Sequence, residues 1–358
     1  KNIDNWFWVR YTLNPYSGCE HACVYCDGRS RKYYLHEDFE QTIIIKEAAA
    51  AQLDKNLSRA RAMLPDVIGF GGVCDAYQPI ERDEKVSRRL LKVIAKHGFP
   101  LFISTKSNMV TRDLDLLSLI AEKTWCTVNF TITTLDSSLS SFLEPGAPSP
   151  SERLEALQTI KDTHPGIQAG TNMIPIIPYL GDSKENLEGI VKATKNAGGD
   201  HVLFGAGVTM RDEQGEYFLR KVAFREPGIA THLREVHLNR TPESAKWVRD
   251  TNEQVMHYCI KHDIAPRVKR WIPQDFRKNN YQVAEFLLGK AFRLQVEGKR
   301  YKKWLWAGLH IQNLKESLFD IQLRGALEEI QGMTPQIVKI IEPLIKDTAG
   351  KVRLDDYL

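Results

Sequence analysis

Three cysteines stand within eight residues near the start of the chain. Cys19, Cys23 and Cys26 follow the spacing Cys-x3-Cys-x2-Cys in the stretch GCEHACVYCDG. Thiolates are the usual ligands of iron–sulfur clusters, and a cluster of four irons takes four ligands. Three thiolates leave one iron open to a cofactor or substrate, much as a catalytic zinc site keeps one position open. The spacing therefore favours a 4Fe-4S cluster with one open iron.

Three other interpretations of this spacing explain it less well. A structural zinc site normally takes four ligands, and only His21 lies nearby as a fourth, with no second CxxC pair in the chain. A redox pair made of Cys23 and Cys26 leaves Cys19 without a role. A purely structural trio would be an odd use of reactive thiols in a loop.

The other cysteines and the composition indicate a reducing compartment. Cys74, Cys126 and Cys259 are far from any other cysteine, and six cysteines in 358 residues do not make a disulfide framework. No signal peptide or apolar run of about 18 residues is evident, so we expect a cytoplasmic protein without a membrane partner. The chain begins at Lys1 rather than at methionine, which leaves a preceding segment open.

The elements that must position the cysteines alternate along the chain. Short apolar runs predict six strands, at 11–16, 67–72, 100–105, 127–134, 167–174 and 201–208. Helices are predicted between them, at 46–63, 83–97, 112–123, 149–163 and 183–197. This alternation is typical of right-handed βαβ units, so we expect an α/β fold with a partial (β/α)6 TIM-like barrel. Chemistry in such barrels gathers at the C-terminal ends of the strands.

The pattern changes near residue 210. Beyond it, helices are predicted at 241–261, 282–295, 302–309, 314–325 and 334–346, without further strands. Since single cores stop growing at about 250–300 residues, a second region is expected. We predict a barrel domain over 1–210 and a mainly helical C-terminal extension over 211–358 that covers the substrate.

The cysteine motif resembles that of the radical S-adenosylmethionine (SAM) superfamily, in which an aromatic residue precedes the third cysteine, as Tyr25 does here. The resemblance implies that SAM chelates the open iron. It also implies that one electron from the cluster cleaves SAM to methionine and a 5′-deoxyadenosyl radical. A partial barrel belongs to this superfamily, and an electron donor such as flavodoxin or ferredoxin is expected as a partner.

Longer segments narrow the resemblance to the group that includes spore photoproduct lyase. The segments are NPYSGCEHACVYC, GGVCDAYQPIER, ISTKSNMVTRDLDLL, TITTLDSSLSSFLEPGAPSPSERL and IPIIPYLGD. They are most similar to relatives of that lyase that carry D-x-YQP-x-E and EP-x-APSP segments. Asp27 departs from the group, in which many members have a tyrosine after the third cysteine. This difference affects the packing beside the cluster and does not change the three cysteine ligands.

Three residues after the second and third predicted strands are candidates for binding the methionine end of SAM. The resemblance implies that the amino group meets the backbone near Gly72 and the carboxylate of Asp75. It implies that Lys106 meets the methionine carboxylate. The simpler alternatives are a turn residue at Asp75 and a solvated lysine at Lys106.

Polar residues of the next two strands are candidates for the rest of the cofactor. Asn129, Thr131 and Thr133 share one face of the fourth predicted strand, and the resemblance implies a ribose contact there. Asn172 on the fifth strand is expected to line the same cavity. The β-propensity of threonine is the simpler explanation for the two threonines.

Cys74 is a candidate catalytic residue because it precedes Asp75 at the mouth of the second strand. Spore photoproduct lyases use a cysteine of the corresponding strand as a hydrogen-atom donor, two positions earlier in our alignment. Residues two apart share a face of a strand, so Cys74 can face the same cavity. The alternative is a small buried residue.

A basic and aromatic segment runs from Arg267 to Trp306. Between residues 267 and 303, eleven Lys/Arg stand against three acids, and aromatic residues are interleaved. Such a composition suits phosphates and unpaired bases, whereas the alternative is a helical cap with an aromatic core. We therefore expect a radical SAM lyase or modifying enzyme acting on nucleic acid. Peptide or small-molecule substrates rank next, and a non-catalytic metal-binding protein last.

Overall fold

The computed structural model describes residues 3–33, 38–59 and 64–346, which divide into two compact units. Tyr11–Val268 forms the larger unit, and the described parts of Lys1–Arg10 and Lys269–Leu358 form the smaller one. Residues 211–268, which the sequence analysis grouped with the C-terminal region, thus belong to the compact unit of the sheet. The substrate-covering role expected for 211–358 stays a prediction.

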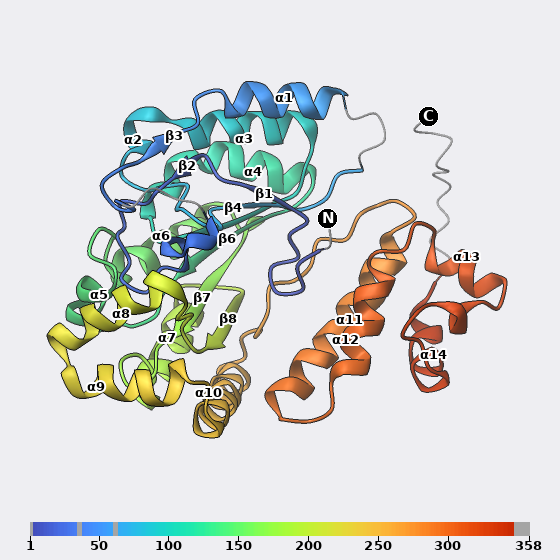
Figure 1. Cartoon of the computed structure of the whole chain (residues 1–358). Coiled ribbons are helices and arrows are strands. Elements are labelled where there is room, and N and C mark those ends of the chain that lie inside the picture. Colours follow the sequence, from blue (N-terminus) through green and yellow to red (C-terminus); the bar gives the residue numbers. More distant parts are fainter. Residues whose placement is uncertain (1–2, 34–37, 60–63, 347–358) are drawn as a thin grey trace. The chain divides into compact units, whose positions relative to one another are not determined.

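The larger unit is built on an open sheet of six parallel strands (Figure 1). The strand order is β1-β4-β5-β6-β7-β8, so each strand pairs with its neighbour in the predicted series. The strands are β1 (Tyr11–Leu13), β4 (Ile68–Phe70), β5 (Leu101–Thr105), β6 (Cys126–Thr131), β7 (Gln168–Ile176) and β8 (His201–Ala206). The predicted α/β fold with a partial barrel is confirmed.

Helices connect the strands as the sequence predicts. They are α1 (Ala49–Arg59), α2 (Glu81–Glu84), α3 (Val86–His97), α4 (Leu114–Lys123), α6 (Pro150–Thr163) and α7 (Lys184–Asn196). Residues 60–63 of the first predicted helix lie outside the described residues. The third helix starts later than predicted because residues Asn108–Asp113 form a 3-10 turn, capped by the Ser107 hydroxyl.

The first strand is shorter than predicted, and two other short strands were not predicted. Asn14 precedes Pro15, which has no amide hydrogen to donate, so the ladder of β1 ends at Leu13. The chain then forms β2 (Tyr16–Ser17), which pairs antiparallel with β3 (Ile44–Ile45). This small ribbon leads directly into the three cysteines.

The larger unit also contains helices that the sequence analysis missed. They are α5 (Ser137–Leu143), α8 (Asp212–Arg225), α9 (Pro227–His232) and a π-helical turn at Leu233–Leu238, followed by the predicted α10 (Pro242–Lys261). Helix α10 packs on β8 and α7. Among the missed helices, α5 and α8 pack apolar side chains against Val24 and Tyr25 of the cysteine motif. They therefore support the candidate site directly.

The smaller unit is helical, as predicted, and uses many of the interleaved aromatics as its core. Its helices are α11 (Lys278–Val296), α12 (Lys302–Ile311), α13 (Leu318–Leu323) and α14 (Pro335–Ile341). Tyr281, Phe292 and Trp304 are buried. Arg270 is buried as well, with its guanidinium 4.0 Å from the centre of the Tyr281 ring. Much of the basic and aromatic segment therefore serves packing. No helix in the described part of the chain is both long and apolar enough to cross a membrane.

A buried ion pair ties the start of α6 to the end of α5. The capping box of Ser149 and Glu152 begins α6, which places Arg153 on its first turn. The Arg153 guanidinium lies 2.5 Å from a carboxylate oxygen of Glu144, and both side chains are about 1% exposed. Arg153 also donates to the carbonyl oxygens of Thr131, at 2.7 Å, and Pro148, at 2.6 and 2.9 Å. One side chain thus joins β6, α5 and α6.

We expect Arg153→Met to lower the free energy of unfolding by about 3–5 kcal/mol, because it removes the one cation within ion-pair distance of the buried Glu144 carboxylate among the described residues. Urea unfolding followed by circular dichroism measures the loss. Gln158→Met, at an exposed position on the same helix, is the matched control and should change stability by less than about 0.5 kcal/mol. Equal stability of the two variants would contradict this role.

Candidate functional site

The three cysteines lie in one compact loop after β2. Cys19 and Cys23 are buried and Cys26 is half-buried. Two tight turns bring the loop together, since Ala22 N–H donates to Cys19 O at 3.1 Å and Cys26 N–H to Cys23 O at 3.2 Å. Burial first, then Asp75 and the two other thiols, raises the pKa of Cys19 well above its usual value. The three cysteines therefore belong to one compact, largely buried loop.

One side of the cysteine loop is held by residues 74–81, which we call the YQP segment. The Gln78 side-chain amide spans the loop, accepting from Glu20 N–H at 2.9 Å and donating to Gly18 O at 3.2 Å. In return, Ile80 N–H donates to the Glu20 carboxylate at 2.6 Å. The buried Glu81 accepts a hydrogen bond from the hydroxyl of Tyr16, which precedes the loop. This segment fixes the position of the first cysteine.

The opposite side of the cysteine loop is held by residues 143–150, which we call the EPG segment. Gly146 N–H donates to His21 O at 3.1 Å, and Val24 N–H donates to Leu143 O at 2.9 Å. A Cβ atom at Gly146 would lie 2.0 Å from Glu20 O, so only glycine allows this approach. The Tyr25 hydroxyl donates to Glu144. This segment fixes the stretch between the first and third cysteines.

Buried charges surround the second cysteine. Burial alone would raise the pKa of Glu144, but Arg153 and Lys106 lower it below its usual value, so Glu144 is ionised. Burial raises the pKa of Cys23 to about 12, although the Lys106 ammonium acts against this. The Lys106 ammonium lies 5.5 Å from the centre of the Tyr25 ring. The Lys106 and Arg153 cations therefore lie near Cys23 and Glu144, and cations beside the thiols suit an anionic cluster.

Asp75 lies under the cysteine loop and is fully engaged by protein donors. Its carboxylate accepts from Thr105 Oγ1 at 2.7 Å, Lys106 N–H at 2.7 Å and Tyr77 N–H at 2.8 Å. The His21 ring lies between Asp75 Oδ2, at 3.3 Å, and Gly146 O, at 3.0 Å. Burial alone would raise the pKa of Asp75, but His21 and these donors lower it. The carboxylate is thus ionised and links the YQP and EPG segments.

Gly72 and Cys74 precede Asp75 in the chain and lie in different environments. Gly72 follows β4 and is exposed, and a Cβ atom there would meet nothing within 4 Å. Its backbone is therefore open to a ligand. Cys74 is buried, and its thiol donates to Tyr16 O at 3.0 Å. Burial raises the pKa of Cys74 to about 12, so the group is a protonated thiol at neutral pH.

The polar residues of β6 and β7 lie inside the barrel at different depths. Asn129 is fully buried and bonded within the protein, with Oδ1 2.5 Å from His201 Nε2 and Nδ2 donating to Ile103 O at 3.2 Å. Thr131 pairs with Asn172 in the register between the two strands. Thr133 lies two residues beyond the end of β6 and is buried.

Two of these residues carry buried polar atoms without a hydrogen-bond partner in the structure. They are Oγ1 of Thr133 and Oδ1 of Asn172, while Asn172 Nδ2 donates to Ser104 Oγ at 3.1 Å. An unpaired buried polar atom costs about 1–3 kcal/mol, so these two atoms fit a polar ligand near the C-terminal end of β6 and the middle of β7 beside it.

The sequence analysis missed the residues that hold the loop, namely Gln78, Glu81, Glu144 and Gly146. Each belongs to a segment on which the family resemblance rested. Nothing in the sequence of these segments, however, indicated that they pack against the cysteine loop. Gln214 of α8 was also missed; its amide donates to Tyr25 O at 3.2 Å. Among the described residues, no group of three or more His, Cys, Asp or Glu side chains is arranged for a single metal ion.

The chain belongs to the radical SAM superfamily, whose family model matches residues 13–187. An uncharacterised protein of Methanocaldococcus jannaschii is 34% identical over 188 residues, covering 52% of this chain and 66% of its own. One of Mycobacterium tuberculosis is 29% identical over 232 residues, covering 64% and 67%. One of Acidianus two-tailed virus is 30% identical over 224 residues, covering 58% and 70%.

Solved structures of spore photoproduct lyase variants are similar to this chain in part. One has a TM-score of 0.45 at 19% identity and covers 62% of this chain and 62% of the lyase. Another has a TM-score of 0.48 at 18% identity and covers 69% and 72%. The chain thus spans less than two thirds of the first of these lyases.

Superfamily membership makes a 4Fe-4S cluster and SAM the cofactors of this chain. The donors present fit both groups. The three cysteines of the loop, with the Lys106 ammonium near Cys23 and Cys26, suit an iron–sulfur cluster. The open backbone of Gly72 and the unpaired oxygens of Thr133 and Asn172 suit a polar ligand beside it.

We expect Gly146→Ala to lower the iron bound per chain severalfold after anaerobic reconstitution. The new methyl group would press on Glu20 O, and overpacking of this kind costs about 1–3 kcal/mol, here within the loop that carries the ligands. Iron and sulfide analysis measures the loss. Gly166→Ala is the control, because a Cβ atom there meets nothing within 4 Å. Equal iron contents in the two variants would contradict the role of Gly146.

Proposed function

We propose that this chain is a catalytically active radical SAM enzyme that starts its reaction by abstracting a hydrogen atom from a nucleic acid. The observation that carries the proposal is the three-cysteine loop, whose backbone is held by the YQP and EPG segments. Cys19, Cys23 and Cys26 would hold the cluster, which would supply the electron for the reductive cleavage of SAM. The protein must bind SAM, keep water out and present the substrate.

Individual residues take the following roles in this proposal. Cys19, Cys23 and Cys26 hold the cluster. The backbone at Gly72 receives the SAM amino group, and Asp75 acts by orienting Lys106 and His21, because its oxygens are already engaged. Lys106 pairs with the methionine carboxylate.

Polar side chains of the barrel complete the cofactor site. Thr133 and Asn172 bind the ribose through their unpaired oxygens, and Thr131 lies beside Asn172. Asn129, which is hydrogen-bonded to His201, supports these side chains from within the barrel. In this proposal Thr133 and Asn172 contact SAM directly, whereas Thr131 and Asn129 support them.

Cys74 is proposed as a hydrogen-atom donor to the substrate radical. This role needs an S–H bond, and burial keeps the thiol protonated at neutral pH. The thiol points to Tyr16 O in the structure, so it must rotate about its Cα–Cβ bond to face a substrate. A purely packing role for Cys74 is the alternative.

The choice of a nucleic acid rests on the exposed part of the smaller unit. Basic side chains remain exposed around the turn between α11 and α12, namely Arg293, Lys299, Arg300, Lys302 and Lys303. Exposed cations of this density suit a phosphate backbone. Repair or modification of the substrate, with lyase chemistry, follows the family resemblance, and a peptide or small molecule is the second candidate. A flavodoxin or ferredoxin as electron donor and a cytoplasmic location belong to the same proposal.

We expect the anaerobically reconstituted chain, once reduced, to form 5′-deoxyadenosine from SAM, as measured by chromatography. Replacement of Cys19, Cys23 or Cys26 by Ala should abolish this product, because each removes a cluster ligand. Cys126→Ala is a matched control, since this buried cysteine lies on β6 away from the loop. An active Cys23→Ala variant, or no 5′-deoxyadenosine from the wild-type chain, would overturn the enzyme proposal.

We expect the double variant Arg300→Glu/Lys302→Glu to weaken salt-sensitive binding of single-stranded DNA or RNA by about tenfold or more in gel-shift assays. Lys315→Glu/Lys339→Glu changes two exposed lysines elsewhere in the same unit and should bind as the wild type does. If neither nucleic acid binds, or both double variants bind equally, the result contradicts a nucleic-acid substrate and favours a peptide or small molecule.

A further inference from the structure

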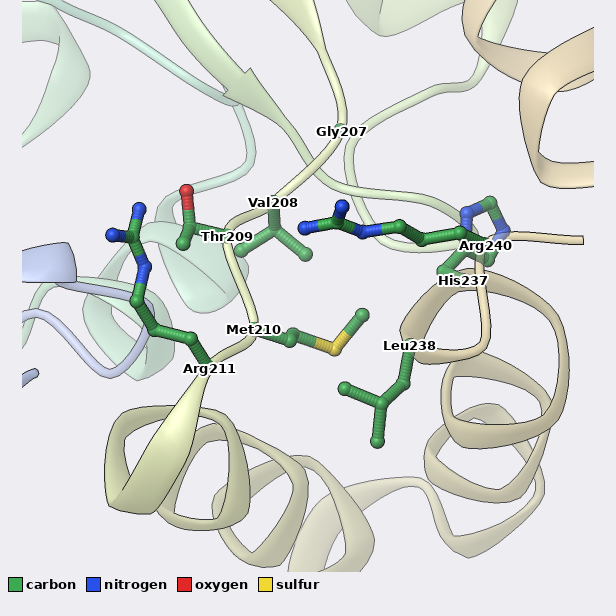
Figure 2. A pocket seen from close by; sticks show the side chains of 8 residues that line it. All are labelled: Gly207, Val208, Thr209, Met210, Arg211, His237, Leu238 and Arg240. Carbon is green, nitrogen blue, oxygen red and sulfur yellow. The ribbon is translucent and has the colours of Figure 1, made fainter.

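A cavity of about 290 Å³ opens at the C-terminal end of β8 in the larger unit (Figure 2). It is lined by Gly207, Val208, Thr209, Met210, Arg211, His237, Leu238 and Arg240. The first five follow β8, and the last three belong to the end of the π-helical turn and the residues after it. In barrels of this type, ligands bind at this end of the strands.

The cavity lies beside the cysteine loop. The Arg211 guanidinium is 3.1 Å from a carboxylate oxygen of Asp27, which directly follows Cys26. In addition, Asp212 accepts a hydrogen bond, at 2.7 Å, from the hydroxyl of Ser30, which is four residues after Cys26. A ligand held in this cavity would therefore be close to the cluster ligands.

Arg240 is the lining cation whose charge the described part of the protein does not neutralise. Its side chain is exposed and extends across the cavity in Figure 2. Arg211, the other lining cation, has Asp27 as its partner, whereas no carboxylate within ion-pair distance of Arg240 is present among the described residues. The backbone of Arg240 is left-handed, with φ of 51°, which costs a non-glycine residue about 1–2 kcal/mol.

The remaining lining side chains are the apolar Val208, Met210 and Leu238, the hydroxyl of Thr209 and the ring of His237. Val208, Met210 and Leu238 present apolar side chains between the two arginines (Figure 2). His237 is held on both ring nitrogens, with Ser244 Oγ 3.1 Å from Nδ1 and Tyr179 OH 3.4 Å from Nε2. The cavity thus combines one available cation with an apolar wall, which suits an anionic group attached to a flat or apolar body.

We propose that this cavity binds one nucleotide unit of the substrate, with Arg240 pairing with its phosphate. The guanidinium offers a planar pair of donors that matches phosphate oxygens, and the apolar wall can contact the sugar or base. The volume lies just below the roughly 300–1,000 Å³ of small-molecule sites, so the cavity has room for one nucleotide and not for a duplex. This inference rests on the proposed nucleic-acid substrate and adds a recognition site that is independent of the α11–α12 turn.

Equilibrium dialysis of the reconstituted full chain tests this inference. The probes are the four deoxynucleoside 5′-monophosphates and the corresponding nucleosides, with saturating SAM present. We expect at least one monophosphate to bind about tenfold or more tightly than its nucleoside. Arg240→Gln should remove this preference, and Arg240→Lys should restore part of it. Arg59→Gln, at an exposed arginine on α1, is the matched control and should keep the preference.

Three results would overturn the inference: no preference for a phosphate in the wild-type chain, an unchanged preference in Arg240→Gln, or a loss of SAM binding in Arg240→Gln. The last result would assign the cavity to SAM rather than to the substrate. Formation of 5′-deoxyadenosine by the wild-type chain is measured separately. If it occurs without a phosphate preference, the cavity assignment fails while the proposed enzyme class stands.

Discussion

The close approach of the EPG segment to the cysteine loop is the contact on which the site depends. Gly146 lies against the backbone of Glu20 and His21, where a methyl group would not fit. From the other side, Gln78 bonds to both residues that flank Cys19. The cysteine loop comprises nine residues, 18–26. Ordering the backbone of such a loop costs roughly 1–2 kcal/mol per residue. The contacts with the two segments offset part of this cost before any cofactor binds.

The same two segments also arrange the charges of the site. Asp75 of the YQP segment and Glu144 next to Gly146 are buried and ionised, and each faces cations or donors on a neighbouring strand or helix. Lys106 contributes to both, through its backbone N–H to Asp75 and its ammonium near Glu144. Buried charges of this kind persist only when their partners are held in place. The fold of the loop and its electrostatics therefore depend on the same residues.

The sequence predicted the strands and the ligands because both carry local signals. Six apolar runs gave the parallel sheet, and the spacing of three cysteines indicated the cluster. What it did not predict were contacts between distant segments: Gln78 with Gly18, Gly146 with Glu20, and Gln214 with Tyr25. Such contacts leave no periodic pattern. Conversely, the aromatic residues from Tyr281 to Trp304 matched a binding surface by composition, yet several of them form a core. Composition alone does not distinguish the two.

The most direct test of a cluster with one open iron is electron paramagnetic resonance of the reconstituted and reduced chain, with and without SAM. We expect a reduced-cluster signal whose g values change when SAM is added, because SAM would bind the iron that the three cysteines leave open. A cluster signal that SAM does not change, or no cluster signal at all, would contradict this account.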